Sequence, residues 1–227
     1  MVEFEGILHG SSESCLIESV SERGSLIKHI ENPSLAVQLA AVKQDGLSIL
    51  FIDNPSGIVQ TEAVQQCGLS IKYIDNPSEF VQLLAVKENY WSIEFIKNPS
   101  EAVQIEAIKD FPYAFKCIAK PTEKVQRIAV AADYELLSII KDPSEFVQLI
   151  AVEQNWLAIC DIPFPSAKIQ MTAVKQDSAA LGCIALPTRG VALAAVRDNN
   201  SSLRLITDLG MFSYISRKLG IKTSLNF

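Results

Sequence analysis

Eight prolines recur at intervals of 22 residues without an insertion or deletion between them: Pro33, Pro55, Pro77, Pro99, Pro121, Pro143, Pro165 and Pro187. Such regular spacing indicates an array of structural repeats rather than a domain with one central core. Other positions keep the same period. Counting offsets from each proline, the next residue is Ser or Thr, offsets four and nine are Val or Ile, offset eight is always Ala, and offset nineteen is always Ile.

Apolar residues at offsets four, eight and nine lie on one face of a helix, so we expect each proline to open a helix of about three turns. In Asn76-Pro77-Ser78-Glu79, the spacing predicts that Asn caps the helix, Pro is its first residue and Glu completes a capping box. We expect each helix to end near offset twelve or thirteen, where Asp45-Gly46, Cys67-Gly68 and Asn199-Asn200 tolerate a left-handed C-cap.

A second, shorter element follows each long helix. Apolar residues at offsets sixteen and nineteen, such as Ile49 and Ile52, predict one to two further turns of helix. Such a pair cannot bury its apolar stripes alone, so neighbouring repeats must stack. We therefore expect an all-α fold, a right-handed α-solenoid of about nine units. Its expected parts are a leader (1–10), a degenerate N-terminal capping repeat (11–32), eight helical repeats (33–208), and a C-terminal capping helix and tail (209–227).

The segments Ala40-Ala41-Val42-Lys43-Gln44-Asp45-Gly46-Leu47 and Ala85-Val86-Lys87-Glu88-Asn89 resemble the short helical repeats of an uncharacterised family with an A-A-V-K-Q-N-G consensus. That family is found in bacteria and their viruses, and the architecture is similar to leucine-rich-repeat-variant and HEAT-like solenoids. The resemblance implies a fold and brings no catalytic residues. Because that family occurs in bacteria and their viruses, a role in phage–host conflict, such as inhibiting or sequestering a defence protein, is a further hypothesis.

Composition narrows the functional classes. A net charge of −6 and a pI near 5.0 disfavour nonspecific nucleic-acid binding. The acidic residues concentrate in the N-terminal half, so opposite charges on the two halves permit self-association. Five cysteines without metal-ligand spacing indicate free thiols in a reducing cytoplasm. No export signal or membrane span is visible. With neither enzyme motifs nor metal or cofactor sites, the sequence predicts a non-enzymatic chain.

Variable positions are better candidates for binding than invariant ones, because uniformity is what a scaffold requires. Large aromatic residues occupy offsets thirteen and fourteen only in the central repeats, and acidic residues occupy offset two in the same repeats. Such residues favour a protein interface. The predicted partner-binding residues are Tyr90, Trp91, Tyr113, Tyr134, Trp156, Glu79, Glu101, Glu123 and Glu145. In the alternative reading, the rings pack over the seam between repeats, with Trp91 and Leu157 replacing Leu47 at a core position.

Two polar stripes remain. Basic residues at offset ten could bind an anionic ligand or nucleic acid together with the basic C-terminal half: Lys43, Lys87, Lys109, Lys175 and Arg197. This alternative is disfavoured because Gln65, Ala131 and Glu153 interrupt the stripe and because the same residues suit the helix dipole. Glutamine occupies offset five in seven repeats, and we interpret it as a partner for backbone groups of the adjacent turn.

Overall fold

The computed structural model describes residues 12–221, so the expected leader of residues 1–10 lies outside the described residues. The chain divides into two compact units, with unit 1 ending at Thr122 and unit 2 beginning at Glu123. Every regular element of the described residues is a helix, which confirms the all-α prediction. Each unit is an α-solenoid in which a long α-helix alternates with a six-residue 3₁₀-helix, labelled η.

From residue 12 onward, where the structure describes unit 1, it contains five such pairs. They are α2 (Glu13–Glu22) with η1 (Gly24–His29), α3 (Leu35–Gln44) with η2 (Gly46–Phe51), α4 (Gly57–Gln66) with η3 (Gly68–Tyr73), α5 (Glu79–Glu88) with η4 (Tyr90–Phe95), and α6 (Glu101–Lys109) with η5 (Pro112–Cys117).

Up to residue 221, the last that the structure describes, unit 2 contains four pairs followed by one further helix. They are α7 (Glu123–Ala132) with η6 (Tyr134–Ile139), α8 (Glu145–Gln154) with η7 (Trp156–Asp161), α9 (Ala167–Gln176) with η8 (Ser178–Cys183), α10 (Arg189–Asp198) with η9 (Asn200–Leu205), and α11 (Leu209–Leu219). Gly220 closes α11 in the left-handed conformation, at φ 64°.

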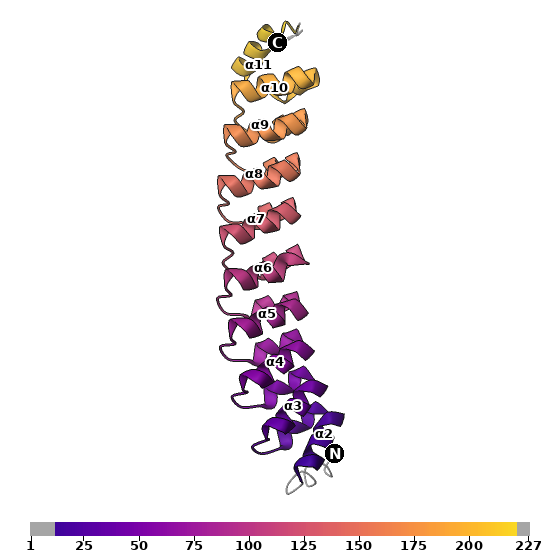
Figure 1. The fold of residues 1–227 in the computed structure, drawn as a ribbon. Helices are drawn as coiled ribbons and strands as arrows, with labels where there is room; N and C mark the ends of the chain where they lie inside the picture. The colour runs from indigo at the N-terminus through magenta and orange to yellow at the C-terminus, as the bar shows by residue number, and fades with distance from the viewer. Residues whose placement is uncertain (1–11, 222–227) are drawn as a thin grey trace. The chain divides into compact units, whose positions relative to one another are not determined.

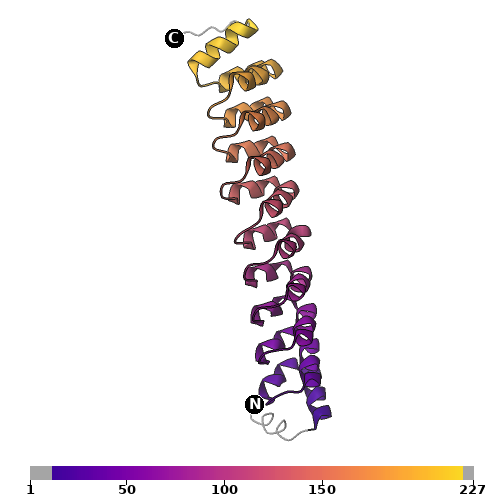
Figure 2. The same ribbon diagram turned by 60° about the vertical axis from the view of Figure 1, so that its left-hand side comes forward.

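Within each unit the α-helices lie side by side in chain order (Figure 1). The 3₁₀-helices stack on one another as a second layer, which is visible beside the α-helices in Figure 2. The core lies between these two layers. Its members are the residues that the period predicts, since Val37, Ala41 and Val42 of α3 are buried together with Ile49 and Ile52.

The helix starts differ from the prediction. The helices α3 to α10 each begin two residues after a proline, and the Ser or Thr between them occupies the N-cap position. In α5, for example, the Val81 backbone N–H donates to Ser78 Oγ at 3.4 Å, whereas Ser56 before α4 makes no such bond. The predicted cap residue, Asn76, instead adopts φ 49°, and Asn32, Asn54, Asn98 and Asp142 take the same left-handed conformation. Asn and Asp tolerate this region, so they turn the chain into the proline while the hydroxyl caps the helix.

The helix ends also differ from the prediction. The residue after α3, Asp45, is extended at φ −148° rather than left-handed, and Cys67 and Asn199 are extended as well. The reason is that the short helix begins at once. Asp45 is its N-cap, because Asp45 Oδ1 accepts the Leu47 N–H at 3.0 Å. The short element itself is confirmed and is a 3₁₀-helix, whose three-residue turn fits apolar residues at offsets sixteen and nineteen.

Among the described residues, none of the helices has both the length and the apolar character needed to cross a membrane.

Candidate functional site

A cluster of aromatic rings joins two consecutive repeats of unit 1. The rings of Tyr90 and Phe111 are stacked with centroids 4.3 Å apart and planes inclined by 16°. Trp91 continues the cluster from Tyr90 at 5.3 Å, and Tyr113 continues it from Phe111 at 6.4 Å. We call these four residues, Tyr90, Trp91, Phe111 and Tyr113, the aromatic cluster. It is a single surface made from the start of η4 and the start of η5.

The cluster is open to solvent. Trp91, Phe111 and Tyr113 are 47%, 41% and 44% exposed, and Tyr90 is half-buried beneath them. The ammonium group of Lys116 lies 4.5 Å from the Tyr113 ring centroid, where a cation is attracted to the ring face. Exposed rings held by mutual stacking offer a large contact area whose side-chain entropy is already reduced.

The sequence reading identified three of the four members and missed Phe111. Phe111 stands at offset twelve, where six other repeats place Asp or Asn and use it to cap the short helix, as Asn89 does through Trp91 N–H. Phe111 makes no such cap. An aromatic residue at a capping position was the signal that could have found it.

The remaining predicted aromatic residues, Tyr134 and Trp156, belong to unit 2. They are half-buried first residues of η6 and η7. Ring contacts in the described part of the chain do not include this pair, so the structure brings together only the unit 1 part of the predicted row.

The alternative in which Trp91 and Leu157 fill a core position is wrong. Offset fourteen faces solvent, with Leu47 42% and Leu157 44% exposed. The buried residues of the short helix lie at offsets fifteen and sixteen, for example Ser92 and Ile93 after Trp91. On a 3₁₀-helix these positions point to a different side from the preceding residue.

The predicted acidic residues carry contacts between repeats. Each carboxylate at offset two accepts a hydrogen bond from the capping hydroxyl of the following repeat, 21 residues later. The bonds run from Ser100 to Glu79, from Thr122 to Glu101, from Ser144 to Glu123 and from Ser166 to Glu145, over 2.5–2.9 Å. Ser34 bonds Glu13 in the same way. These carboxylates therefore stabilise the stacking, and a partner-binding role for them stays a prediction.

The glutamines at offset five behave as interpreted. Nε2 of Gln38, Gln60, Gln82, Gln104, Gln148 and Gln170 donates to the carbonyl of the repeat's own proline over 2.9–3.0 Å. Gln170 Oε1 also accepts the N–H of Thr188, the cap of the next repeat, at 3.1 Å. These glutamine side chains satisfy backbone groups of the loops that would otherwise lose hydrogen bonds on burial.

The basic residues at offset ten are exposed near the ends of their helices. Lys43, Lys87 and Lys109 belong to unit 1, whereas Lys175 and Arg197 belong to unit 2. Lys109 Nζ lies 3.6 Å from Glu106 Oε1. The structure adds no feature to this stripe beyond the helix ends that the dipole favours.

A second aromatic row in unit 1 was missed. Phe51, Tyr73 and Phe95 end η2, η3 and η4 at offset eighteen, and each is partly exposed. Lys72 Nζ lies 5.8 Å from the Tyr73 ring centroid and 5.4 Å from that of Phe95. The signal was present as aromatic residues spaced by 22.

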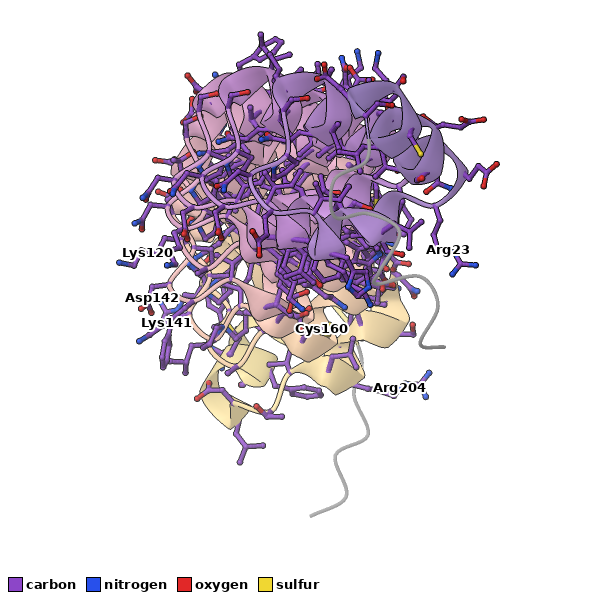
Figure 3. All side chains as sticks on the ribbon, turned by 90° about the horizontal axis from the view of Figure 1, so that it is seen from below. Arg23, Lys120, Lys141, Asp142, Cys160 and Arg204 are labelled. Atoms are coloured by element: carbon purple, nitrogen blue, oxygen red, sulfur yellow. A yellow bond between two sulfur atoms is a disulfide. The ribbon has the colours of Figure 1, made fainter. Side chains whose placement is uncertain are left out.

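The prediction of free thiols is wrong for two cysteines. Cys160, exposed on η7 in unit 2 (Figure 3), is joined to Cys183 on η8 by a disulfide, with Cα atoms 4.9 Å apart. The two residues are 23 apart in sequence, and stacking of adjacent repeats makes such residues neighbours in space. Cys15, Cys67 and Cys117 are free. Burial, and to a lesser degree the nearby Glu94 carboxylate, raise the pKa of the Cys117 thiol.

Comparison with protein-family models, curated proteins and solved structures finds no match for the chain. The helical repeat itself is shown by the paired helices, and membership of a particular repeat family stays a prediction.

Proposed function

We propose that the chain is a non-enzymatic interaction module that binds a partner protein through the aromatic cluster of unit 1. The observation that carries the proposal is the stacked, solvent-exposed ring surface of Tyr90, Trp91, Phe111 and Tyr113. Interfaces enrich Trp and Tyr, and a few such rings usually supply most of the binding energy.

The surrounding architecture supports this role. The most buried residues of these repeats, such as Val81, Ala85 and Ile93, lie outside the cluster, and three of its four rings remain exposed. Rings fixed by stacking lose little further entropy when a partner covers them. The repeat resemblance favours a partner from the phage–host conflict, which the chain would inhibit or sequester.

The test is capture of the partner from nuclease-treated lysate of the source cells by the tagged chain and by Trp91→Ala/Tyr113→Ala. We expect the double variant to lose at least about tenfold in capture, because one central ring alone can contribute about 2 kcal/mol. The matched control is Leu47→Ala, which removes an equally exposed side chain at offset fourteen of another unit 1 repeat.

Equal capture by all three proteins would contradict the aromatic interface. Loss of capture after nuclease treatment, with nucleic acid recovered before it, would instead support the basic stripe of Lys43, Lys87 and Lys109. Thermal unfolding of each variant shows whether the fold is intact, and we expect little change because the replaced side chains are exposed.

A further inference from the structure

Grooves lined by equivalent residues occur beside the loops of several repeats. In unit 1 one such groove is lined by Ile71 and Ile74 of one repeat and by Pro77, Gln82 and Phe95 of the next, and two further unit 1 grooves use the equivalent positions. Unit 2 has a groove of this kind, of about 470 Å³, between η6, η7 and the start of α8. The recurring residues are scaffold, so the positions that differ indicate what a particular groove binds.

The unit 2 groove departs from the others in charge. Its charged lining residues are Asp142 and Asp161, whereas each of the three unit 1 grooves includes at least one lysine. Asp161 occupies the position of Phe95, and Ser138 that of Lys72. Asp142 stands where four unit 1 repeats have Asn. Each change removes positive charge or adds negative charge.

Neither carboxylate of the groove is neutralised. Among the described residues, no basic group forms an ion pair with Asp142 or Asp161, and no hydrogen bond engages either side chain. Lys141, which precedes Asp142 in the same loop, is exposed and does not line the groove. Both aspartates are exposed, so a ligand cation would meet two hydrated carboxylates that no basic side chain of the described residues engages.

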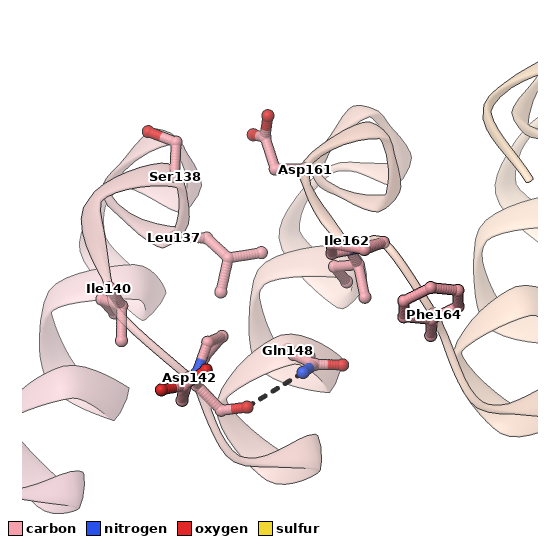
Figure 4. Close-up of a pocket in the computed structure, with 10 residues that line it drawn as sticks. Leu137, Ser138, Ile140, Asp142, Gln148, Asp161, Ile162 and Phe164 are labelled. Carbon is pink, nitrogen blue, oxygen red and sulfur yellow. Dashed lines mark hydrogen bonds between the residues drawn. The ribbon is translucent and has the colours of Figure 1, made fainter.

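The apolar residues of the groove differ in exposure: Leu137 and Ile162 form its buried floor, 3% and 5% exposed, whereas Phe164 is open to solvent. In Figure 4 the two carboxylates lie at opposite ends of the groove, with Leu137 and Ile162 between them and the Phe164 ring at its side. Phe164 is 87% exposed and stands where the unit 1 loops carry Asn or Lys. An arginine side chain combines an aliphatic stem with a planar cation that pairs with carboxylates and stacks on aromatic rings.

We propose that this groove binds an extended, arginine-containing peptide segment of a partner. The guanidinium groups pair with Asp142 and Asp161, and the exposed Phe164 ring provides a stacking face for an arginine side chain. This site lies in unit 2 and does not depend on the aromatic cluster of unit 1.

The test is a titration of the ¹⁵N-labelled full chain with the peptide acetyl-Gly-Arg-Gly-Arg-Gly-amide, followed by amide chemical shifts. We expect saturable shifts around residues 138–142 and 161–164. Asp142→Asn/Asp161→Asn should weaken binding at least about tenfold, since it removes both charge partners. The citrulline peptide, which has the same shape without the charge, should lose as much. Phe164→Ala should weaken binding by a smaller factor.

The matched control is Asp53→Asn/Asp75→Asn, which removes the same charge from two unit 1 grooves and should leave the affinity unchanged. The Asp142 substitution suits its backbone, because Asn occupies this φ in four other repeats. Circular dichroism melts verify folding. Equal weakening by both double variants, equal binding of the citrulline peptide, or shifts confined to other residues would overturn the proposal. Calcium chloride alone shifting the same residues at submillimolar concentration would also overturn it by assigning the groove to a metal ion.

Discussion

The Ser100 hydroxyl lies 2.5 Å from Oε1 of Glu79, across the boundary between two consecutive repeats. The same oxygen of Ser100 accepts the Val103 N–H at 3.4 Å and so begins α6. One hydroxyl therefore caps its own helix and ties that helix to the preceding one. Leu35 and Gly57 occupy offset two of their repeats and carry no carboxylate. The capping serine of the repeat that follows each of them therefore has no such acceptor.

Replacing Glu79 by alanine should lower the free energy of unfolding by about 1 kcal/mol. The substitution removes a charge-assisted hydrogen bond between repeats and a favourable charge in the first turn of α5. Chemical denaturation of wild type and variant measures the difference. Glu88→Ala, at the exposed other end of the same helix, is the control and should remain within about 0.5 kcal/mol of wild type. Equal effects of the two substitutions would show that the bond to Ser100 contributes nothing.

Gly68→Ala should destabilise the chain by about 1–3 kcal/mol. A Cβ at this position would lie 2.5 Å from the Ala85 carbonyl oxygen, which is backbone of the next repeat and cannot move aside alone. Gly57→Ala is the control, because nothing lies within 4 Å of its Cβ position. Alanine there should stabilise α4 by about 0.5–1 kcal/mol. Thermal or denaturant unfolding measures both, and a neutral Gly68→Ala would refute the close approach of η3 to α5.

The Cys160–Cys183 disulfide should be detectable by mass. Alkylation of the unfolded, unreduced chain should modify Cys15, Cys67 and Cys117 and leave two cysteines protected until a reductant is added. Reduction should lower the stability of unit 2 by about 2–4 kcal/mol, the usual effect of opening such a link. Cys160→Ser/Cys183→Ser should match the reduced protein and be insensitive to reductant. Five modified cysteines before reduction would rule the bond out.

Alkylation of Cys117 should require more alkaline pH than an ordinary thiol. Its raised pKa leaves little thiolate, the reactive form, at neutral pH, and the rate should grow as pH rises through that pKa. Glu94→Gln should move the midpoint partway toward lower pH, because burial is the larger cause and remains. Residue-resolved mass spectrometry of iodoacetamide labelling measures the rates. A rate that has already reached its plateau at neutral pH would contradict the shift.

The parts of the fold that follow from period alone are readable in the sequence. Val37, Ala41 and Val42 share a helical face whatever precedes the helix, so their burial could be predicted. The helix boundaries could not be predicted, because Asn76 and Ser78 are both of residue types that cap helices. Only the left-handed turn at Asn76, with φ 49°, leaves the Ser78 hydroxyl in place to cap the helix. A local sequence pattern does not fix where a helix begins when two residues close in sequence can both satisfy the first backbone N–H groups of that helix.

The candidate sites were less predictable because they depend on contacts between repeats. Trp91 and Tyr113 stand out as unusual residue types, but the stacking of Phe111 on Tyr90 depends on how η4 meets the repeat that follows. The partnership of Glu79 with Ser100 and the bond between Cys160 and Cys183 have the same origin. Residues 21 to 23 apart become neighbours only when repeats stack, and the sequence alone does not give that register.

The uninterrupted 22-residue period has a consequence for inheritance. Because successive boundaries reuse the same proline turn, capping hydroxyl and glutamine bond, an in-frame gain or loss of 66 nucleotides within a unit joins repeats whose contacts already match. Gain or loss of a single codon would disturb the contacts of the repeat that carries it, whereas repeats further along the chain keep their own spacing. Recombination between the repeated gene segments can therefore alter the number of binding positions in a single event, without a new interface having to evolve.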